Sequence, residues 1–365
     1  MDTMTERMSL LQTSLLLVTA IVPTAVLTLP TFMVEHARQD GWLSVLVATF
    51  YGLLLATIYL PLLKRMGRTD LVTFSEQTLG KYLGKGIGLI VLLAYFILAV
   101  LIVREISALL LSAYFGKTPL WFMDAFNIVI ATILVYLGLE VIARGNQFFF
   151  PFLLVFYLTG VVMLVDEWEL DFIRPVLYRG VDPVLEGTLP ATLFFGEIFI
   201  ILVLAPSIHH VSKAYKALIP AVLAIGVFVF LAVWTVLLLF GVELVQVLTF
   251  PFLSASRYVG GFTIMQNIDA LVMAIWVIGG IFKITIFLYV ITFLGAKVIS
   301  LNNYNFVLFI MVPILFFVSH YYIDNYIHLV ELIGLVTPYY FIIHVGIPLM
   351  LLFTSYFRGI SFEDH

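Results

Sequence analysis

Long runs of apolar residues follow one another along the whole chain, separated by short polar connections. Most runs reach or exceed the roughly 20 residues that an α-helix needs to cross a bilayer, so each predicts one transmembrane helix. The first run ends in charged residues without a small-residue cleavage site, so we interpret it as a retained helix and not as a secretory signal. The ten predicted spans cover residues 10–34, 42–63, 86–115, 120–141, 147–165, 189–207, 217–240, 269–293, 304–319 and 333–356.

The composition indicates the same class of protein. Of the 365 residues, 63% are hydrophobic and only 11% are charged, whereas a soluble domain has about 45–50% apolar and about 25% charged residues. The chain is therefore predicted to be an all-α integral membrane protein, which excludes soluble enzymes. The net charge of −4 offers no basic stripe, so no nucleic-acid partner is expected. The lack of cysteine excludes disulfides and thiolate metal sites.

Lysine and arginine residues are divided unequally between the two sides of the predicted spans, with eleven on one side and five on the other. Because cations are retained on the cytoplasmic side during insertion, both termini are predicted to be cytoplasmic. The richer side holds Arg7, Lys64, Arg65, Arg68, Lys81, Lys85, Arg144, Lys213, Lys216, Lys297 and Arg358. The poorer side holds Arg38, Lys117, Arg174, Arg179 and Arg257.

Two connections on the outer side are long enough to carry structure of their own. Residues 166–187 mix apolar side chains with acids and a proline, which indicates a short helix on the membrane surface or, as the alternative, a plain solvated loop. Residues 241–268 have a similar mix, and we expect a short surface helix there, followed by a hinge at Gly260 and Gly261.

The ten spans divide into two halves of five, residues 1–165 and residues 166–365. An odd number of spans per half makes the second half insert upside down, as in the inverted repeats of secondary transporters. In that architecture the first helix of each half is interrupted near the midplane and binds a small polar ligand. Pro23 in helix one and Gly196 in helix six predict such interruptions. The alternative is that these residues only bend the helices for packing.

Glu197 and Lys283 are the most informative ionisable residues because each lies inside an apolar span. A charge at the bilayer centre costs about 3 kcal/mol on insertion scales, so each must face a partner, a cavity or water. We expect the Lys283 ammonium to reach toward the break in helix one, either in place of a bound metal cation or to pair with Glu197. The alternative is a buried ion pair that only fixes helix packing.

The other charges near the spans favour structural roles. Arg104 and Glu105 are adjacent in the third helix and point about 100° apart, so we expect them to serve different neighbours or, as the alternative, to lie nearer the helix end. Glu140 and Arg144 are spaced to pair at a helix end, and Asp269 is placed to cap helix eight. The histidines show no metal-binding spacing, so neither a metal nor a cofactor is expected.

Several short segments carry a resemblance to a known family. They are Leu29-Pro30, Gln39-Asp40-Gly41-Trp42-Leu43-Ser44, Arg174-Pro175-Val176-Leu177, Phe195-Gly196-Glu197-Ile198, and Asp269 with Trp276. The chain resembles the spore germination protein family, the B subunits of GerA-type germinant receptors, which looks like a branch of the amino acid–polyamine–organocation transporter superfamily. The resemblance implies a LeuT/APC-like fold, residence in the spore inner membrane or bacterial cell membrane, association with receptor A and C subunits, and recognition of a small-molecule germinant such as an amino acid.

We therefore expect a receptor subunit, not an enzyme, that binds an amino acid between helices one and six, with walls from helices three and eight. The main alternative is a proton-coupled amino acid transporter in which Glu197 titrates. A ligand-opened ion or water pathway and a purely structural subunit also stay open. The predicted ligand-binding residues are Thr19, Val22, Pro23, Thr24, Phe194, Phe195, Gly196, Glu197, Trp276, Gly279 and Lys283.

Overall fold

The computed structural model describes residues 7–113, 115–259, 268–323 and 326–362. Within these ranges the chain is almost entirely helical, and one isolated bridge between Met8 and Ile208 is the only strand-like pairing. The prediction of an all-α fold is confirmed. The α-helices are α1 (Leu10–Ala37), α2 (Gly41–Met66), α3 (Leu71–Leu79), α4 (Lys81–Ala113), α5 (Leu120–Leu137), α6 (Leu139–Val162), α7 (Asp182–Gly196), α8 (Ile200–Leu204), α9 (Tyr215–Val247), α10 (Pro251–Val259), α11 (Ile268–Val298), α12 (Asn305–Tyr322), α13 (Tyr326–Phe341) and α14 (Ile347–Phe357).

Nine stretches of the described residues are long and apolar enough to cross a membrane, and the first of them, residues 10–66, contains both α1 and α2. The chain is thus a multi-pass membrane protein, while the count of ten spans stays a prediction. One predicted boundary is wrong, because α5 gives way to α6 at Gly138, whose φ of 99° suits a glycine turn. Glu140 and Arg144 pair as expected, but in the first turns of α6.

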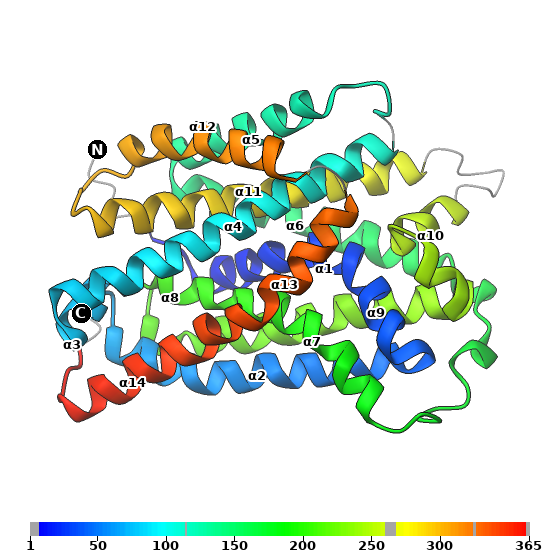
Figure 1. The fold of residues 1–365 in the computed structure, drawn as a ribbon, viewed down its shortest axis with the longest axis horizontal. Coiled ribbons are helices and arrows are strands. Elements are labelled where there is room, and N and C mark those ends of the chain that lie inside the picture. Colours follow the sequence, from blue (N-terminus) through cyan, green and yellow to red (C-terminus); the bar gives the residue numbers. More distant parts are fainter. Residues whose placement is uncertain (1–6, 114, 260–267, 324–325, 363–365) are drawn as a thin grey trace.

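The long helices lie side by side along the longest dimension of the molecule, with α1 in the interior (Figure 1). Helix α1 packs against α9, α7, α11 and α6 and is buried along most of its length. The peripheral helices α5, α6 and α12 instead expose many large apolar side chains, which is typical of surfaces that face lipid. The interior of the bundle is therefore where a site protected from lipid can form.

Helix α1 is continuous through Pro23 and Pro30, so the predicted interruption of the first helix is wrong. A proline removes only one backbone donor, and its fixed φ is compatible with a helix. Neighbouring helices compensate for such a loss in a membrane bundle, and here α1 is surrounded by them. Packing has overridden the local tendency of Pro23 to open the helix.

The sixth predicted span does change its helical form at the predicted place. Helix α7 ends at Gly196, a 3₁₀ turn covers Glu197–Phe199, and α8 follows for five residues. The backbone angles of Gly196 and Glu197 stay in the right-handed helical region, so the change is a tightening and not an unwound loop. Mid-helix 3₁₀ turns often mark functional hinges.

The start of α1 and the end of α14 lie at one end of the bundle (Figure 1). The Met8 amide donates to the Ser207 carbonyl at 2.8 Å, and Arg68 donates to the carbonyl of Pro206 next to it. Three residues before Arg68, Arg65 donates to the carbonyl of Ile360 at 2.8 Å. The start of α1 and the end of α14 therefore share one face of the membrane, as the predicted topology requires. That this face is cytoplasmic stays a prediction.

The opposite end contains the two outer connections. Of the predicted connection 166–187, residues 166–181 contain no α-helix, only the 3₁₀ turns Val165–Glu167 and Leu170–Ile173, so the loop interpretation is correct there. Residues 182–187 already belong to α7, so the sixth helix begins earlier than predicted. The second connection does contain a helix, α10, but much of it is buried instead of lying on the surface. The hinge expected at Gly260 and Gly261 lies outside the described residues, as does the Asp269 side chain.

Candidate functional site

Lys283 is the centre of a buried polar group inside the bundle. It is fully buried, and its Nζ donates hydrogen bonds to Thr24 Oγ1 at 2.6 Å and to Glu197 Oε2 at 2.8 Å. The same nitrogen lies 5.5 Å from the ring centre of Phe194 and 5.4 Å from that of Phe287. An ammonium is attracted to the faces of aromatic rings at this range. One lysine on α11 thus connects α1, α7 and the turn that follows α7.

A second carboxylate lies beside this ion pair. Glu105 on α4 is 3% exposed, accepts a hydrogen bond from Thr28 Oγ1, and interacts electrostatically with both Lys283 and Glu197. Thr24 and Thr28 are four residues apart and therefore lie on one face of α1. The Thr24 hydroxyl accepts a hydrogen bond from Lys283 of α11, and the Thr28 hydroxyl donates one to Glu105 of α4.

The face of α11 next to Lys283 contacts α1 closely at Pro23. Trp276 Nε1 donates to the carbonyl of Pro23 at 2.6 Å, and a Cβ on Gly279 would lie 3.0 Å from Pro23 Cγ. A Cβ at position 279 would therefore require the Pro23 ring to shift by a few tenths of an ångström. Pro23, Trp276 and Gly279, three of the predicted ligand-binding residues, thus lie along the wall beside the ion pair.

Gly196 makes room for a histidine from the last membrane-spanning segment. A Cβ at position 196 would lie 1.9 Å from Nδ1 of His344, which is itself buried. His344 belongs to a π-helical turn, Ile342–Gly346, and its carbonyl accepts a hydrogen bond from Tyr59 at 2.7 Å. Both helical irregularities, the 3₁₀ turn at Glu197 and the π turn at His344, meet at this one contact.

The predicted ligand-binding residues thus separate into groups. Thr24, Phe194, Glu197 and Lys283 lie together, while Phe195 points to α2, where its ring is 3.0 Å from the place of a Cβ on Gly52. Thr19 lines a separate cavity, and Val22 is buried in α1. Sequence reasoning missed Glu105, Thr28 and His344 as members of the site. The spacing of Thr28 from Thr24 was the one signal that could have indicated its place.

Arg104 turns away from this site, as expected from its position next to Glu105. Its guanidinium bonds to Asp124 Oδ2 at 3.2 Å and donates to the carbonyl of Ile323. His320 Nδ1 also lies 3.3 Å from Asp124 Oδ2. The expectation that Arg104 and Glu105 serve different neighbours is confirmed, and this second polar cluster joins α4, α5 and α12.

Comparison with known proteins gives a family and a fold. The family described as "Spore germination protein" matches residues 7–326. Among individual relatives, spore germination protein KB of Bacillus subtilis (strain 168) is 25% identical over 257 residues, which covers 69% of each chain. Spore germination protein YndE of the same organism is 24% identical over 318 residues, or 86% of this chain and 87% of the relative.

The fold is shared with solved transporters. The nucleobase-cation-symport-1 family transporter MHP1, in a closed conformation with bromovinylhydantoin bound, matches 99% of this chain and 86% of its own, with a TM-score of 0.60 and 12% identity. The transporter-like LeuT/APC-type membrane fold that the sequence analysis expected is therefore confirmed. With a family match over most of its length, this multi-pass membrane chain belongs to the spore germination protein family.

Proposed function

We propose that this chain is the membrane subunit of a spore germinant receptor, in which an amino acid binds at the Lys283–Glu197 site and the signal passes to partner A and C subunits. The family supports the role in germination. The observation that carries the ligand class is the buried group of one ammonium and two carboxylates, Lys283, Glu197 and Glu105. The carboxylate of an amino acid zwitterion can pair with Lys283, and its ammonium can pair with Glu197 or Glu105.

The charges of this group are unbalanced in a way that favours a cationic ligand group. If all three residues are ionised, their charges sum to −1. Buried charges away from water need partners, so the group should accept one further positive charge. The ligand ammonium lies beside Glu197 and Glu105, while the ligand carboxylate takes the place of Glu197 at the Lys283 Nζ. Because a zwitterion is neutral, the sum stays −1 unless one carboxylate also takes up a proton. Binding is thus an exchange of ion-pair partners.

The exchange also gives a route from binding to signalling. The Lys283–Glu197 pair holds α11 against the 3₁₀ turn after α7, and the Lys283–Thr24 bond holds α11 against α1. Both charged side chains are almost completely buried, so a ligand enters only when these helices separate. A ligand that binds the separated state better shifts the population toward it. Partner subunits would read the resulting helix positions.

The experiment is a thermal-shift screen of the standard L-amino acids on the purified full chain. A ligand at a hundred times its Kd stabilises the folded state by about 2.7 kcal/mol, which raises Tm measurably. We expect the shift to disappear in Lys283→Met and in Glu197→Gln. Lys297→Met is the matched control, because Lys297 lies on the same helix but pairs with Asp70 at 3.3 Å. Full shifts in both site variants would place the ligand elsewhere.

The same unbalanced charge supports one rival, a proton-coupled amino acid transporter. The additional positive charge would then be a proton carried by one of the two carboxylates during the cycle. Uptake of labelled amino acid into proteoliposomes that contain this chain alone separates the two functions. Accumulation driven by a pH gradient and lost in Glu197→Gln would establish the transporter, whereas binding without flux is the result that the receptor predicts.

A further inference from the structure

Two buried glutamates, Glu105 and Glu197, share one cation inside the bundle. These residues are 3% and 2% exposed, and both interact electrostatically with Lys283. The two glutamates also repel each other when both are ionised. A charge buried away from water needs a compensating partner. One ammonium compensates one carboxylate, so the group is neutral only when the other glutamate carries a proton.

The hydrogen-bond partners of the two glutamates differ in kind. Glu197 Oε2 accepts from Lys283 Nζ at 2.8 Å, and an ammonium can only donate, so this contact favours an ionised Glu197. Glu105 Oε1 is instead bonded to the hydroxyl of Thr28. A hydroxyl can donate or accept, so it suits a protonated carboxyl group as well as a carboxylate. Glu105 is therefore the glutamate that can hold a proton without losing its hydrogen bond.

The charged groups around Glu105 leave it without a cation of its own. Among the described residues no ion pair includes Glu105, and Lys283, which acts on it from a greater distance, is bonded to Glu197. Arg104, its neighbour in the sequence, turns to Asp124 of α5. Other ionisable side chains on the helices packed against α4 have contacts elsewhere: His320 lies at Asp124 Oδ2, Tyr340 donates to the Ala94 carbonyl, His344 lies against Gly196, and Lys297 pairs with Asp70.

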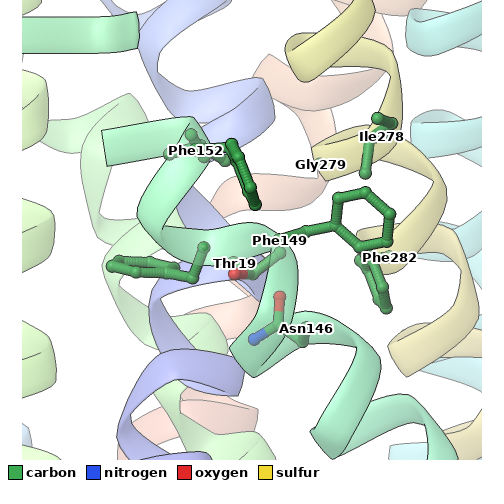
Figure 2. Close-up of a pocket in the computed structure, with 9 residues that line it drawn as sticks. Thr19, Asn146, Phe149, Phe152, Ile278, Gly279 and Phe282 are labelled. Carbon is green, nitrogen blue, oxygen red and sulfur yellow. The ribbon is translucent and has the colours of Figure 1, made fainter. Parts of the chain in front are cut away.

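The cavity between α1, α6 and α11 does not solvate Glu105 either. Figure 2 shows this cavity between Thr19 of α1, Asn146 of α6 and Gly279 of α11. The surface that borders it is apolar, and neither Glu105 nor the ion pair lines it. The space in this cavity therefore does nothing to stabilise a negative charge on Glu105.

We propose that Glu105 is a proton-binding site: while Lys283 and Glu197 form an ion pair, the Glu105 carboxyl group is protonated and the buried group is neutral. The inference also deepens the proposed function. When an amino acid zwitterion exchanges partners, its ammonium pairs with Glu197 and its carboxylate with Lys283, so the group stays neutral with the same proton on Glu105. This second step rests on the proposed function, whereas the proton on Glu105 does not.

The first test follows Tm of the full chain, without an amino acid, between about pH 6 and about pH 8, where a glutamate in water is ionised. The folded chain then binds one proton more than the unfolded chain, so the folding equilibrium constant falls by about tenfold per pH unit through this group. Glu105→Gln keeps the shape of the protonated group but binds no proton. Its Tm should therefore rise relative to wild type as the pH rises. A difference in Tm that stays the same at every pH would overturn the proposal.

The second test detects the proton by infrared spectroscopy. A protonated carboxyl group has a C=O stretching band that a carboxylate lacks, and we expect this band in wild type and its loss in Glu105→Gln. Glu140→Gln is the matched control, because Glu140 is partly exposed and pairs with Arg144, so the band and the pH dependence of Tm should not change.

Two spectroscopic results would overturn the proposal. One is a wild-type spectrum without the band, and the other is a band that Glu105→Gln keeps and Glu197→Gln loses, which would place the proton on Glu197. Because both tests are made without an amino acid, their failure is a separate result from a failure of amino acid binding.

Discussion

Gly196, at the end of α7, has no side chain, and the His344 ring lies in the space that a side chain there would fill. Because the His344 ring is buried on all sides, it has no room to move away from a new methyl group at position 196. We expect Gly196→Ala to destabilise the protein by about 1–3 kcal/mol, the usual cost of overpacking a filled interior. The measurement is Tm of the purified chain.

The control for this substitution is another helical glycine with free space around it. Gly160 on α6 has nothing within 4 Å of a built Cβ. Gly160→Ala should leave Tm unchanged or raise it, since alanine favours a helix over glycine by about 1 kcal/mol. Equal tolerance of alanine at positions 196 and 160 would show that the contact with His344 is not tightly packed.

Ionisable residues inside apolar runs were the most predictable part of the site. The cost of an isolated charge in the membrane was enough to predict that Lys283 would reach toward helix one, with replacement of a metal cation and pairing with Glu197 as the two alternatives. The structure contains the contact with Thr24 of α1 and the pair with Glu197. Glu105 was placed correctly as separate from Arg104 but was not assigned to the site. Its contact with Thr28 depends on how α4 is rotated against α1, which the sequence of either helix leaves open.

Whether a helix ends or continues at a given residue depends in some places on the local sequence and in others on packing against neighbouring helices. Gly196 ends α7 at the predicted place and Gly138 ends α5 inside a predicted span, whereas Pro23 leaves α1 unbroken. Helix α1 is enclosed by other helices, which hold the segment that contains Pro23 in place. Enclosure alone does not separate the two cases, because residues 193–205 around Gly196 are also buried. The proposed ligand therefore has no unwound first helix to bind, so in this proposal side chains on α4, on α7 with the turn that follows it, and on α11 supply most of the recognition.

The segment between α1 and α2 is tied to the outer loop by one carboxylate. Both oxygens of Asp40 accept from the amide of Leu177, at 3.0 and 3.1 Å, and Gln39 Nε2 donates to the Pro175 carbonyl at 3.0 Å. Two of the segments that resemble the germination family therefore contact each other.

We expect Asp40→Ala to release the outer loop locally while the bundle stays folded. Loss of the acceptor leaves the Leu177 amide without its partner, so its hydrogen exchange should become at least several times faster. Asp171→Ala is the control, because Asp171 is exposed and bonds only loosely to Arg174, at 3.4 Å. Unchanged exchange at Leu177 in Asp40→Ala would contradict the role of this contact.

For the molecule as a whole, the orientation in the membrane follows from charge and can be measured directly. Most lysines and arginines outside the spans belong to the end at which α1 starts and α14 ends. Because the chain has no cysteine, single cysteines can be introduced without background. Arg179→Cys should react with a membrane-impermeant maleimide on intact cells, whereas Ser361→Cys should react only after lysis. The reverse pattern would invert the topology.

The overall architecture was predictable because span length and charge are physical requirements of a bilayer. The match to a solved transporter over 99% of the chain agrees with that prediction at the level of the fold. The division into inverted halves at residue 165 stays a prediction. What the sequence could not provide is which helix faces meet, since that depends on packing among many apolar side chains of similar character.

The central claim is that an amino acid exchanges partners with the buried ion pair. The most direct measurement is a structure of the chain with the amino acid that gives the largest thermal shift. We predict the ligand carboxylate within hydrogen-bonding distance of Lys283 Nζ, its ammonium beside Glu197 or Glu105, and a separation between Lys283 Nζ and Glu197 Oε2 well above the present 2.8 Å. A ligand bound elsewhere, with that pair intact, would contradict the account.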